Sequence, residues 1–337
     1  MKTTTIRDVA KAAGVHPSTV SRVINGNTNI SQDTVNKVLT VIKELNYVPN
    51  ALARGLKTNK LHTFGMLIPD IVNPFFAGLA RGVENAANEH GYNVILCNTD
   101  YSLEKEITYL RLLEERRVEG LILANAKFQY KSIIELEKRR LPYMLLSRNI
   151  KGLQKNSISI DNIAGGFLAT QYLIRLGHKK IGHIAGPYNT NATMDRIKGY
   201  KKALQYYGIS FDKQYLSRGD FKNRGGYHIM NNYLKFDDPP TAIFTANDLL
   251  AVGVLEAIKE KGYDVPHDFS IVGFDDIQLA SHLSPPLTTI RQPMLDMGYL
   301  AIIKLLERIE KQISHENIFL KPELIERKSC SKYQKVK

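Results

Sequence analysis

Side chains suited to binding a hydroxyl-rich small molecule follow a series of short apolar runs. Carboxylates accept hydrogen bonds from hydroxyls, Arg and Asn side chains donate them, and a Phe ring can cover the apolar face of a sugar. The side chains of this kind are Asp70, Asn73, Phe75, Phe76, Asp100, Ser147, Arg148, Asp161, Asn162, Arg196, Asn247, Asp248, Asp275 and Asp276. Taken singly, each is also typical of a helix cap or a turn, so their significance depends on whether they converge.

The apolar runs themselves predict how these side chains are positioned. They cover residues 64–68, 92–97, 120–124, 143–146, 181–185, 242–245 and 270–274, and they alternate with amphipathic helical stretches. Continuous apolar strands separated by helices predict parallel sheets that are buried on both faces. The pattern restarts near residue 180, which indicates two doubly wound α/β domains. Ligands in such folds lie beyond the carboxyl ends of the strands, so a cleft between the two domains is expected.

The first 57 residues predict a separate unit that contains only helices. Thr5 and Asp8 approximate a capping box, and Gly14 can end the first helix in the left-handed conformation. Pro17 suits the first position of a second helix, and Ser31 is expected to cap a third. The expected buried face of the third helix consists of Val35, Val38, Leu39, Ile42 and Leu45. This order of helices is the outline of a helix-turn-helix DNA-binding unit.

Positive charge is concentrated in the same segment. Residues 1–60 contain nine Lys or Arg and three Asp or Glu, so they carry +6 of the chain's net +13, and the other 277 residues share +7. An alternative is a small helical unit with a merely solvated polar face. The charge supports DNA binding, because phosphates attract such a concentration of basic residues.

Three stretches of this segment resemble the LacI/GalR family of bacterial transcriptional regulators, in its catabolite-control and ribose-repressor branch. They read TIRDVAKAAGV, STVSRVING and ELNYVPNALARGL. The resemblance implies that the second helix enters the major groove, with Pro17, Ser18 and Arg22 at base-reading positions. The residues expected to contact phosphates are Thr5, His16, Ser21 and Asn25.

Residues 50–56, which read NALARGL, lie between the helical unit and the core. The resemblance implies a hinge helix that orders on DNA and packs beside its copy from a second subunit in the minor groove. Its expected DNA-contacting residues are Asn50, Ala53 and Leu56, and Leu56 matches a leucine that wedges between base pairs. The alternative is a plain linker, because Gly55 weakens a helix.

The resemblance extends over the core and implies the fold of the periplasmic sugar-binding proteins. IPDIVNPFFAGLARGVE resembles the first pocket loop, and RIKGY places Arg196 at a ligand-contacting position. GDF, TANDLLAVG and GFDD do the same for Phe221, Asn247 and Asp275. PPLTTIRQP places residues 288–291 at a crossover between subdomains and Gln292 beside the pocket.

Ser147 departs from the family pattern. Many sugar-binding members have Leu-Asp-Arg where this chain has Leu146-Ser147-Arg148. The loss of that aspartate, with Arg148 and Arg196 retained, makes the expected pocket more positive. This slightly favours an acidic sugar or a sugar phosphate over a neutral hexose.

The expected organisation has five parts. They are a headpiece over 1–49, a hinge over 50–60, a first core subdomain over 61–160 with 291–318, a second over 161–290 with 319–330, and a polar tail over 331–337. The tail lacks the leucine heptads of a tetramerising coiled coil. A homodimer on pseudo-palindromic DNA is therefore expected, because two-fold protein symmetry imposes the palindrome.

Several function classes are disfavoured. Two cysteines without a C-x-x-C argue for a reducing cytoplasm and against a disulfide scaffold or a metal site. Neither a membrane-spanning apolar run nor a signal-peptide core is present in the sequence. Enzyme and cofactor motifs such as the P-loop are missing, and no spacing supports a glycosidase pair of carboxylates.

One further interpretation stays open at this point. A protein co-repressor of the phosphocarrier type could control the regulator by docking on the last long helix around Lys304. Lys304 is more typical of a plain surface lysine.

Overall fold

The computed structural model describes residues 4–24, 29–47, 61–124, 141–147, 156–188, 190–311 and 317–334. Two compact units divide the chain, Met1–Leu61 and His62–Lys337. The expected hinge over 50–60 lies outside the described residues.

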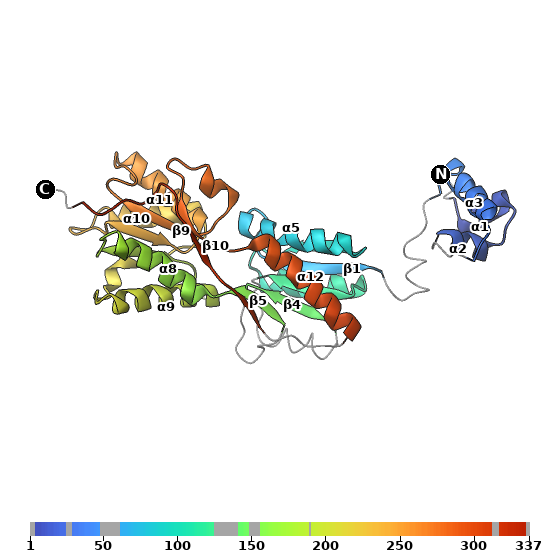
Figure 1. The fold of residues 1–337 in the computed structure, drawn as a ribbon, viewed down its shortest axis with the longest axis horizontal. Helices are drawn as coiled ribbons and strands as arrows, with labels where there is room; N and C mark the ends of the chain where they lie inside the picture. The colour runs from blue at the N-terminus through green and yellow to red at the C-terminus, as the bar shows by residue number, and fades with distance from the viewer. Residues whose placement is uncertain are drawn as a thin grey trace. The chain divides into compact units, whose positions relative to one another are not determined.

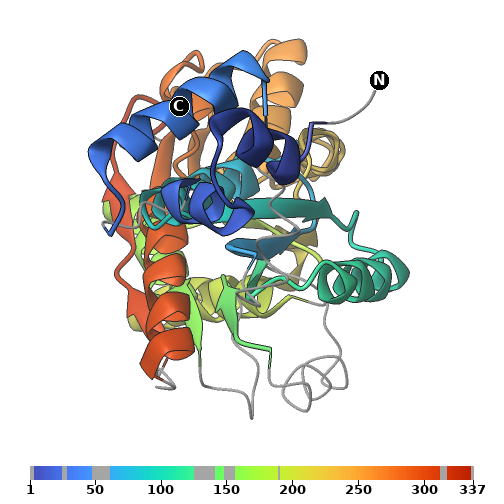
Figure 2. The ribbon, with the colours of Figure 1, turned by 90° about the vertical axis from the view of Figure 1, so that its right-hand side faces the viewer.

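The headpiece contains α1 (Ile6–Ala13), α2 (Pro17–Ile24) and α3 (Gln32–Glu44), which pack against one another in Figure 2. The predicted capping box is present. The backbone N–H of Thr5 donates to the Asp8 carboxylate over 2.9 Å, and the Asp8 N–H donates to Thr5 Oγ1 over 3.4 Å. Gly14 ends α1 with a φ of 61°. The buried apolar residues of this unit are Val9, Ala10, Ala13, Val20, Val23, Val38 and Val41.

Two details of α3 differ from the prediction. Leu39 and Leu45 are 45% and 37% exposed, whereas Val41 is buried. The buried stripe of this short helix is narrow, and Leu39 lies one residue outside it. Ser31 occupies the N-cap position, but its hydroxyl hydrogen-bonds to Thr34 Oγ1 over 2.9 Å and makes no capping bond to the helix backbone.

The core is built on two six-stranded sheets. The first has the order β11-β5-β4-β3-β1-β2, and all its neighbouring strands are parallel. Its strands are β1 (Thr63–Ile68), β2 (Asn93–Asn98), β3 (Gly120–Ala124), β4 (Tyr143–Leu146), β5 (Ser157–Ile160) and β11 (Ile318–Leu320).

The second sheet has the order β12-β10-β9-β8-β6-β7 and is parallel except for β12, which runs antiparallel to β10. Its strands are β6 (Ile181–Ala185), β7 (Leu216–Arg218), β8 (Ala242–Thr245), β9 (Ser270–Asp275), β10 (Thr288–Arg291) and β12 (Glu323–Ile325). The two predicted doubly wound domains are thus both present.

Helices cover both faces of each sheet. On the first sheet, α5 (Pro74–Glu89) packs beside α12 (Met294–Lys311) (Figure 1). The opposite face is covered by α6 (Leu103–Glu115). On the second, α8 (Asn162–Arg175) pairs with α9 (Asn191–Tyr206), and α10 (Asn223–Tyr233) pairs with α11 (Asp248–Glu260). A Cβ added to Gly82 or Gly298 would lie about 2 Å from a backbone oxygen of the partner helix, so α5 and α12 are in backbone contact.

The chain crosses between the two subdomains three times. The crossings fall at residue 161, at 292–293 and at 321–322, between elements of different sheets. Two expected boundaries therefore need correction. Arg291 ends β10 in the second sheet, and the boundary expected after residue 318 falls inside β11 of the first sheet.

The segment after residue 330, which the sequence predicted to be a polar tail, is hydrogen-bonded to the core. The backbone N–H of Ser331 donates to Ser270 Oγ over 3.1 Å, and that of Tyr333 donates to the Leu176 carbonyl over 2.8 Å. These bonds hold residues 331–333 against the second subdomain.

Candidate functional site

A cleft between the two core subdomains is lined by side chains from both sheets. The lining residues are Asn73, Phe75, Phe76, Tyr101, Ser147, Ala192, Arg196, Phe221, Asn247, Asp275 and Gln292. The first five come from the first subdomain, the next five from the second, and Gln292 from the second crossing. Convergence at the carboxyl ends of the strands, which the sequence predicted, is therefore seen for most of the proposed residues.

Backbone strain is concentrated at this cleft. Tyr101, Ser147, Phe221 and Asp275 have φ values of 58°, 54°, 64° and 115°, a region that side chains other than glycine rarely adopt. Such conformations cost about 1–3 kcal/mol each and persist where the surrounding structure enforces them, typically at ligand sites.

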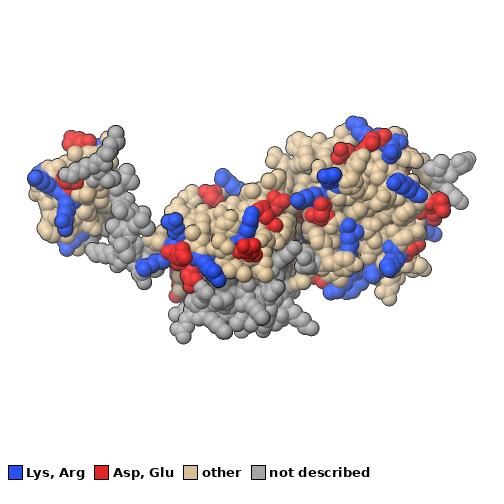
Figure 3. All heavy atoms as spheres, turned by 180° about the vertical axis from the view of Figure 1, so that it is seen from behind, with Lys and Arg blue, Asp and Glu red and all other residues tan. Residues whose placement is uncertain are grey.

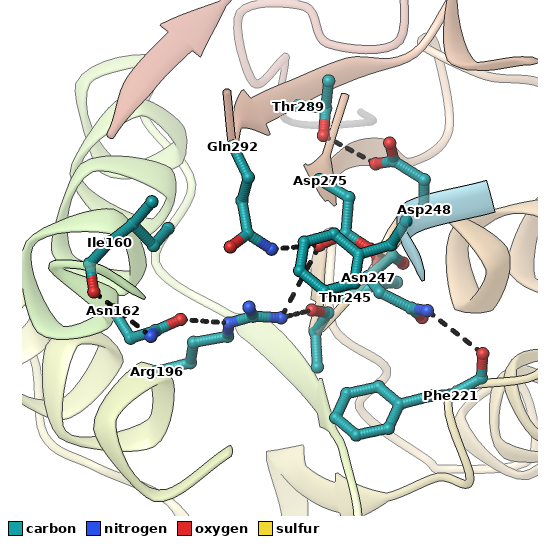
Figure 4. A network of polar contacts seen from close by, with 12 residues as sticks. Ile160, Asn162, Arg196, Phe221, Thr245, Asn247, Asp248, Asp275, Thr289 and Gln292 are labelled. Carbon is teal, nitrogen blue, oxygen red and sulfur yellow. Dashed lines mark hydrogen bonds and ion pairs between the residues drawn. The ribbon is translucent and has the colours of Figure 1, made fainter. Parts of the chain in front are cut away.

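Arg196 is the buried cation of the cleft. Its Nε donates to Asn162 Oδ1 over 2.9 Å, its Nη1 donates to the Ala246 carbonyl, and its guanidinium lies 3.6 Å from the centroid of the Phe274 ring (Figure 4). Burial lowers the pKa of Arg196 to about 10, while Asp275 acts in the opposite direction. The side chain is thus fixed by α8, by β9 and by the residue that follows β8, before any ligand binds.

Asp275 ends β9 and faces Arg196 across 4.0 Å. Gln292 Nε2 donates to Asp275 Oδ1 over 2.6 Å, and Gln292 Oε1 is buried without a hydrogen-bond partner in the described structure. Burial raises the pKa of Asp275 to about 6, against the effects of Arg196 and Gln292. A buried acceptor without a partner suits a ligand that donates, such as a hydroxyl.

Asn247 and Asp248 form hydrogen bonds that hold the backbone around the cleft in place. Asn247 Nδ2 donates to the Phe221 carbonyl over 3.0 Å, and its Oδ1 caps α11. Asp248 accepts from Thr289 Oγ1 over 2.6 Å and from the Ile277 N–H over 2.9 Å (Figure 4). Burial raises the pKa of Asp248 well above its usual range, and the charge of Asp275 adds to this.

Three predicted side chains have other roles. Asp70 and Asp100 do not line the cleft: Asp70 accepts from the Val72 N–H over 3.0 Å, and exposed Asp100 pairs with Lys105. Asp161 caps α8 by accepting from the Ala164 N–H over 2.9 Å. Arg148 lies outside the described residues.

The prediction missed Tyr101 and Ala192. Tyr101 follows Asp100 in a left-handed turn after β2, and this turn places the tyrosine in the cleft and leaves the aspartate in solvent. Burial raises the pKa of Tyr101 to about 12, with further contributions from the carboxylates of Asp70, Asp275 and Asp220.

The proposed base-reading surface of the headpiece is on α2. Ser18 and Arg22 are exposed, and Pro17 and Ser21 are half-buried. His16 caps this helix, because its Nδ1 accepts from the Ser18 N–H over 3.3 Å. Asn25, Asn50, Ala53 and Leu56 lie outside the described residues. On the face of the core in Figure 3, basic and acidic side chains are interspersed.

Comparison with known proteins identifies the family. A family model described as bacterial regulatory proteins of the lacI family matches residues 5–50, and one described as a periplasmic binding protein-like domain matches residues 170–330. The ribose operon repressor of Escherichia coli K12 is 40% identical over 328 residues, which cover 97% of this chain and 99% of the relative. The chain belongs to the LacI family.

Other relatives agree with this assignment. The HTH-type transcriptional repressor PurR of Aliivibrio salmonicida is 38% identical over 97% of this chain and 99% of its own length. A lac repressor dimer bound to operator and the anti-inducer ONPF superposes with a TM-score of 0.89 at 30% identity, covering 98% of this chain and 100% of that one. A LacI-family regulator from Enterococcus faecium with bound ribose gives 0.73 at 34% identity, covering 81% and 100%.

This LacI-family protein is therefore a DNA-binding transcriptional repressor with an effector-binding core, and its relatives are repressors rather than enzymes. Among the described helices, none is both long and apolar enough to cross a membrane. The described side chains include no cluster of three or more His, Cys, Asp or Glu that could hold a metal ion.

Proposed function

We propose that a sugar-like effector, bound in the cleft, controls the affinity of this repressor for its operator in the bacterial cytoplasm. The observation that carries the proposal is the arrangement of Arg196, Asp275 and Gln292. The Arg196 guanidinium and the Asp275 carboxylate are buried and face each other, and Gln292 Oε1 has no hydrogen-bond donor within the described structure. Phe75, Phe76 and Phe221 add apolar walls, a combination that fits a ring bearing several hydroxyls.

The charge balance bears on the kind of sugar. Within the described lining, Arg196 is the one cation, and Asp275, Asn162 and the Ala246 carbonyl already engage it. A neutral sugar therefore needs no further compensation. The acidic sugar or sugar phosphate that Ser147 favours is a second candidate, and it would depend on Arg148 for additional positive charge.

The protein co-repressor has less support. Lys304 donates to Glu307 over 2.8 Å, and the side chains are only 24% and 31% exposed, so the lysine is not a free charge on α12. We propose a homodimer that places two copies of α2 in adjacent major-groove half-sites, because the lac repressor relative is a dimer on its operator.

The test combines effector binding with operator binding. Calorimetry on the full chain with D-ribose, neutral hexoses, glucose 6-phosphate and a phosphocarrier protein should give heat with at least one sugar. The same sugar should shift operator affinity in a fluorescence-anisotropy titration, by about 1.4 kcal/mol for a ligand that discriminates tenfold between the two states. Binding of the phosphocarrier alone would contradict the proposal.

A further inference from the structure

A second cavity adjoins the effector cleft. Its lining consists of Ser147, Ser159, Ile160, Asp161, Asn162, Ile163, Asn191, Ala192, Asp195 and Phe319, and we call it the side chamber. Ser147 and Ala192 also line the main cleft, so the two cavities share a wall. In Figure 4, Ile160 and Asn162 lie on the opposite side of the Arg196 guanidinium from Asp275 and Phe221. The side chamber therefore extends the site beyond Arg196.

Two serines line the side chamber. Ser147 is 6% exposed and Ser159 is 3% exposed. Ser159 lies on β5 directly opposite Phe319 of β11, and the Phe319 side chain is 54% exposed although it lines the same cavity. Serine hydroxyls that line a cavity can donate to and accept from a hydroxyl-rich occupant.

The charge of the lining restricts the class of occupant. Asp161 and Asp195 are the only charged residues of the described lining, and both are acids. Asp161 uses one carboxylate oxygen to cap α8, and Asp195 pairs with Lys198 over 3.1 Å at the rim. Carboxylate and hydroxyl oxygens accept from hydroxyl groups, whereas the two carboxylates repel an anionic group. Phe319 offers a flat apolar face beside them.

We propose that the side chamber is a subsite for a second, uncharged sugar ring, so that the preferred effector is a disaccharide or glycoside that spans both cavities. This inference rests on the proposed function of the cleft. The first ring lies against Arg196 and Asp275, and the second ring lies against Phe319 with its hydroxyls donating to Asp161 and Asp195. A phosphate in the place of the second ring is disfavoured by the two carboxylates.

Calorimetry on the full chain tests this with matched ligands, namely glucose against cellobiose, galactose against lactose, D-ribose and glucose 6-phosphate. At least one disaccharide should bind about tenfold or more tightly than its monosaccharide, the equivalent of one hydrogen bond to a charged group. Phe319→Ala and Asp195→Asn should remove most of that margin and leave the monosaccharide dissociation constant within about twofold.

Matched controls separate the subsite from general effects. Phe211→Ala removes a similarly exposed aromatic side chain that contacts Lys201, and Asp238→Asn removes an exposed acid paired with Lys180. Both should leave every dissociation constant unchanged. The subsite assignment is wrong if monosaccharides bind and no disaccharide binds more tightly than its monosaccharide. It is also wrong if glucose 6-phosphate, and not a disaccharide, binds about tenfold more tightly than glucose. The proposed function stands in both cases. If no sugar binds at all, both are overturned.

Discussion

Gln292 and Asp275 are joined twice. The Gln292 side chain donates to Asp275 Oδ1 over 2.6 Å, and the Gln292 backbone N–H donates to the Asp275 carbonyl over 3.1 Å. Gln292 is part of the second crossing between the subdomains, and Asp275 is the carboxylate of the cleft. A ligand that changes the partners of Asp275 therefore acts directly on a segment about which the two subdomains can rotate.

Asp275→Asn should remove the response to the effector. The variant keeps the shape of the side chain but loses the charge opposite Arg196, so the effector should no longer discriminate between two states of the core. Operator affinity without ligand should stay within about twofold of the wild type. Anisotropy titrations with and without the sugar measure this, and Asp238→Asn is the control. A full response in the Asp275 variant would show that the cleft is not the control site.

The same variant should change the pH dependence of stability. The pKa of Asp275 is raised from 3.8 to about 6, so between these values the folded core holds more protons than the unfolded chain. Its contribution to stability is fully present below the lower value and is lost as the pH rises through about 6. Relative to the wild type, the free energy of unfolding of Asp275→Asn should therefore increase between pH 4 and about pH 6.5. Urea denaturation at several pH values measures it, and a constant difference would contradict the assignment.

Arg22→Ala should relax sequence preference. Arg22 is exposed on α2, and a bidentate contact to guanine contributes about 1–3 kcal/mol of discrimination. Binding to operators with single base-pair changes should show the loss at one position in each half-site. Lys43→Ala removes an exposed charge from the last turn of α3 and should leave base preference unaltered. Equal weakening on all sequences would reduce Arg22 to a phosphate contact.

Gly14→Ala should destabilise the headpiece by about 1–2 kcal/mol, because its φ of 61° is unfavourable for a residue with a Cβ. An added Cβ would meet only Lys37 Nζ at 3.6 Å, so crowding contributes little. Gly14→Asn should cost less, since asparagine tolerates this conformation. Hydrogen exchange of the α1 amides distinguishes the variants. Equal losses in both would assign the effect to packing.

Strands that coincide with a continuous apolar run could be read from the sequence, whereas strands without such a run could not. The seven strands predicted from apolar runs are all present, with ends within one residue. Ser157–Ile160 was missed because its serines alternate with isoleucines, and Ile318–Leu320 and Glu323–Ile325 because three residues carry no period. These strands form through pairing with neighbours that are distant in sequence, which local patterns do not record.

The residues of the cleft were likewise predicted only in part. Asn247 and Asp275 were predicted because each lies at the end of an apolar run, and the resemblance of RIKGY to the family pattern added Arg196. Tyr101 was not, because its position depends on two consecutive left-handed residues, Asp100 and Tyr101, at φ values of 51° and 58°. Neither is a glycine, so nothing in the local sequence marks the turn.

The close contact of α5 with α12 has a consequence for biosynthesis. Residues 62–160 contain most of the first subdomain, but the helix that covers the apolar face of α5 begins only at Met294, and the edge strand β11 follows at Ile318. In between, the ribosome makes the second subdomain from α8 to β10, and only β12 and the residues after it follow β11. The first subdomain therefore remains incomplete until α12 and β11 have been synthesised. We expect it to depend on chaperones during translation more than the second subdomain does.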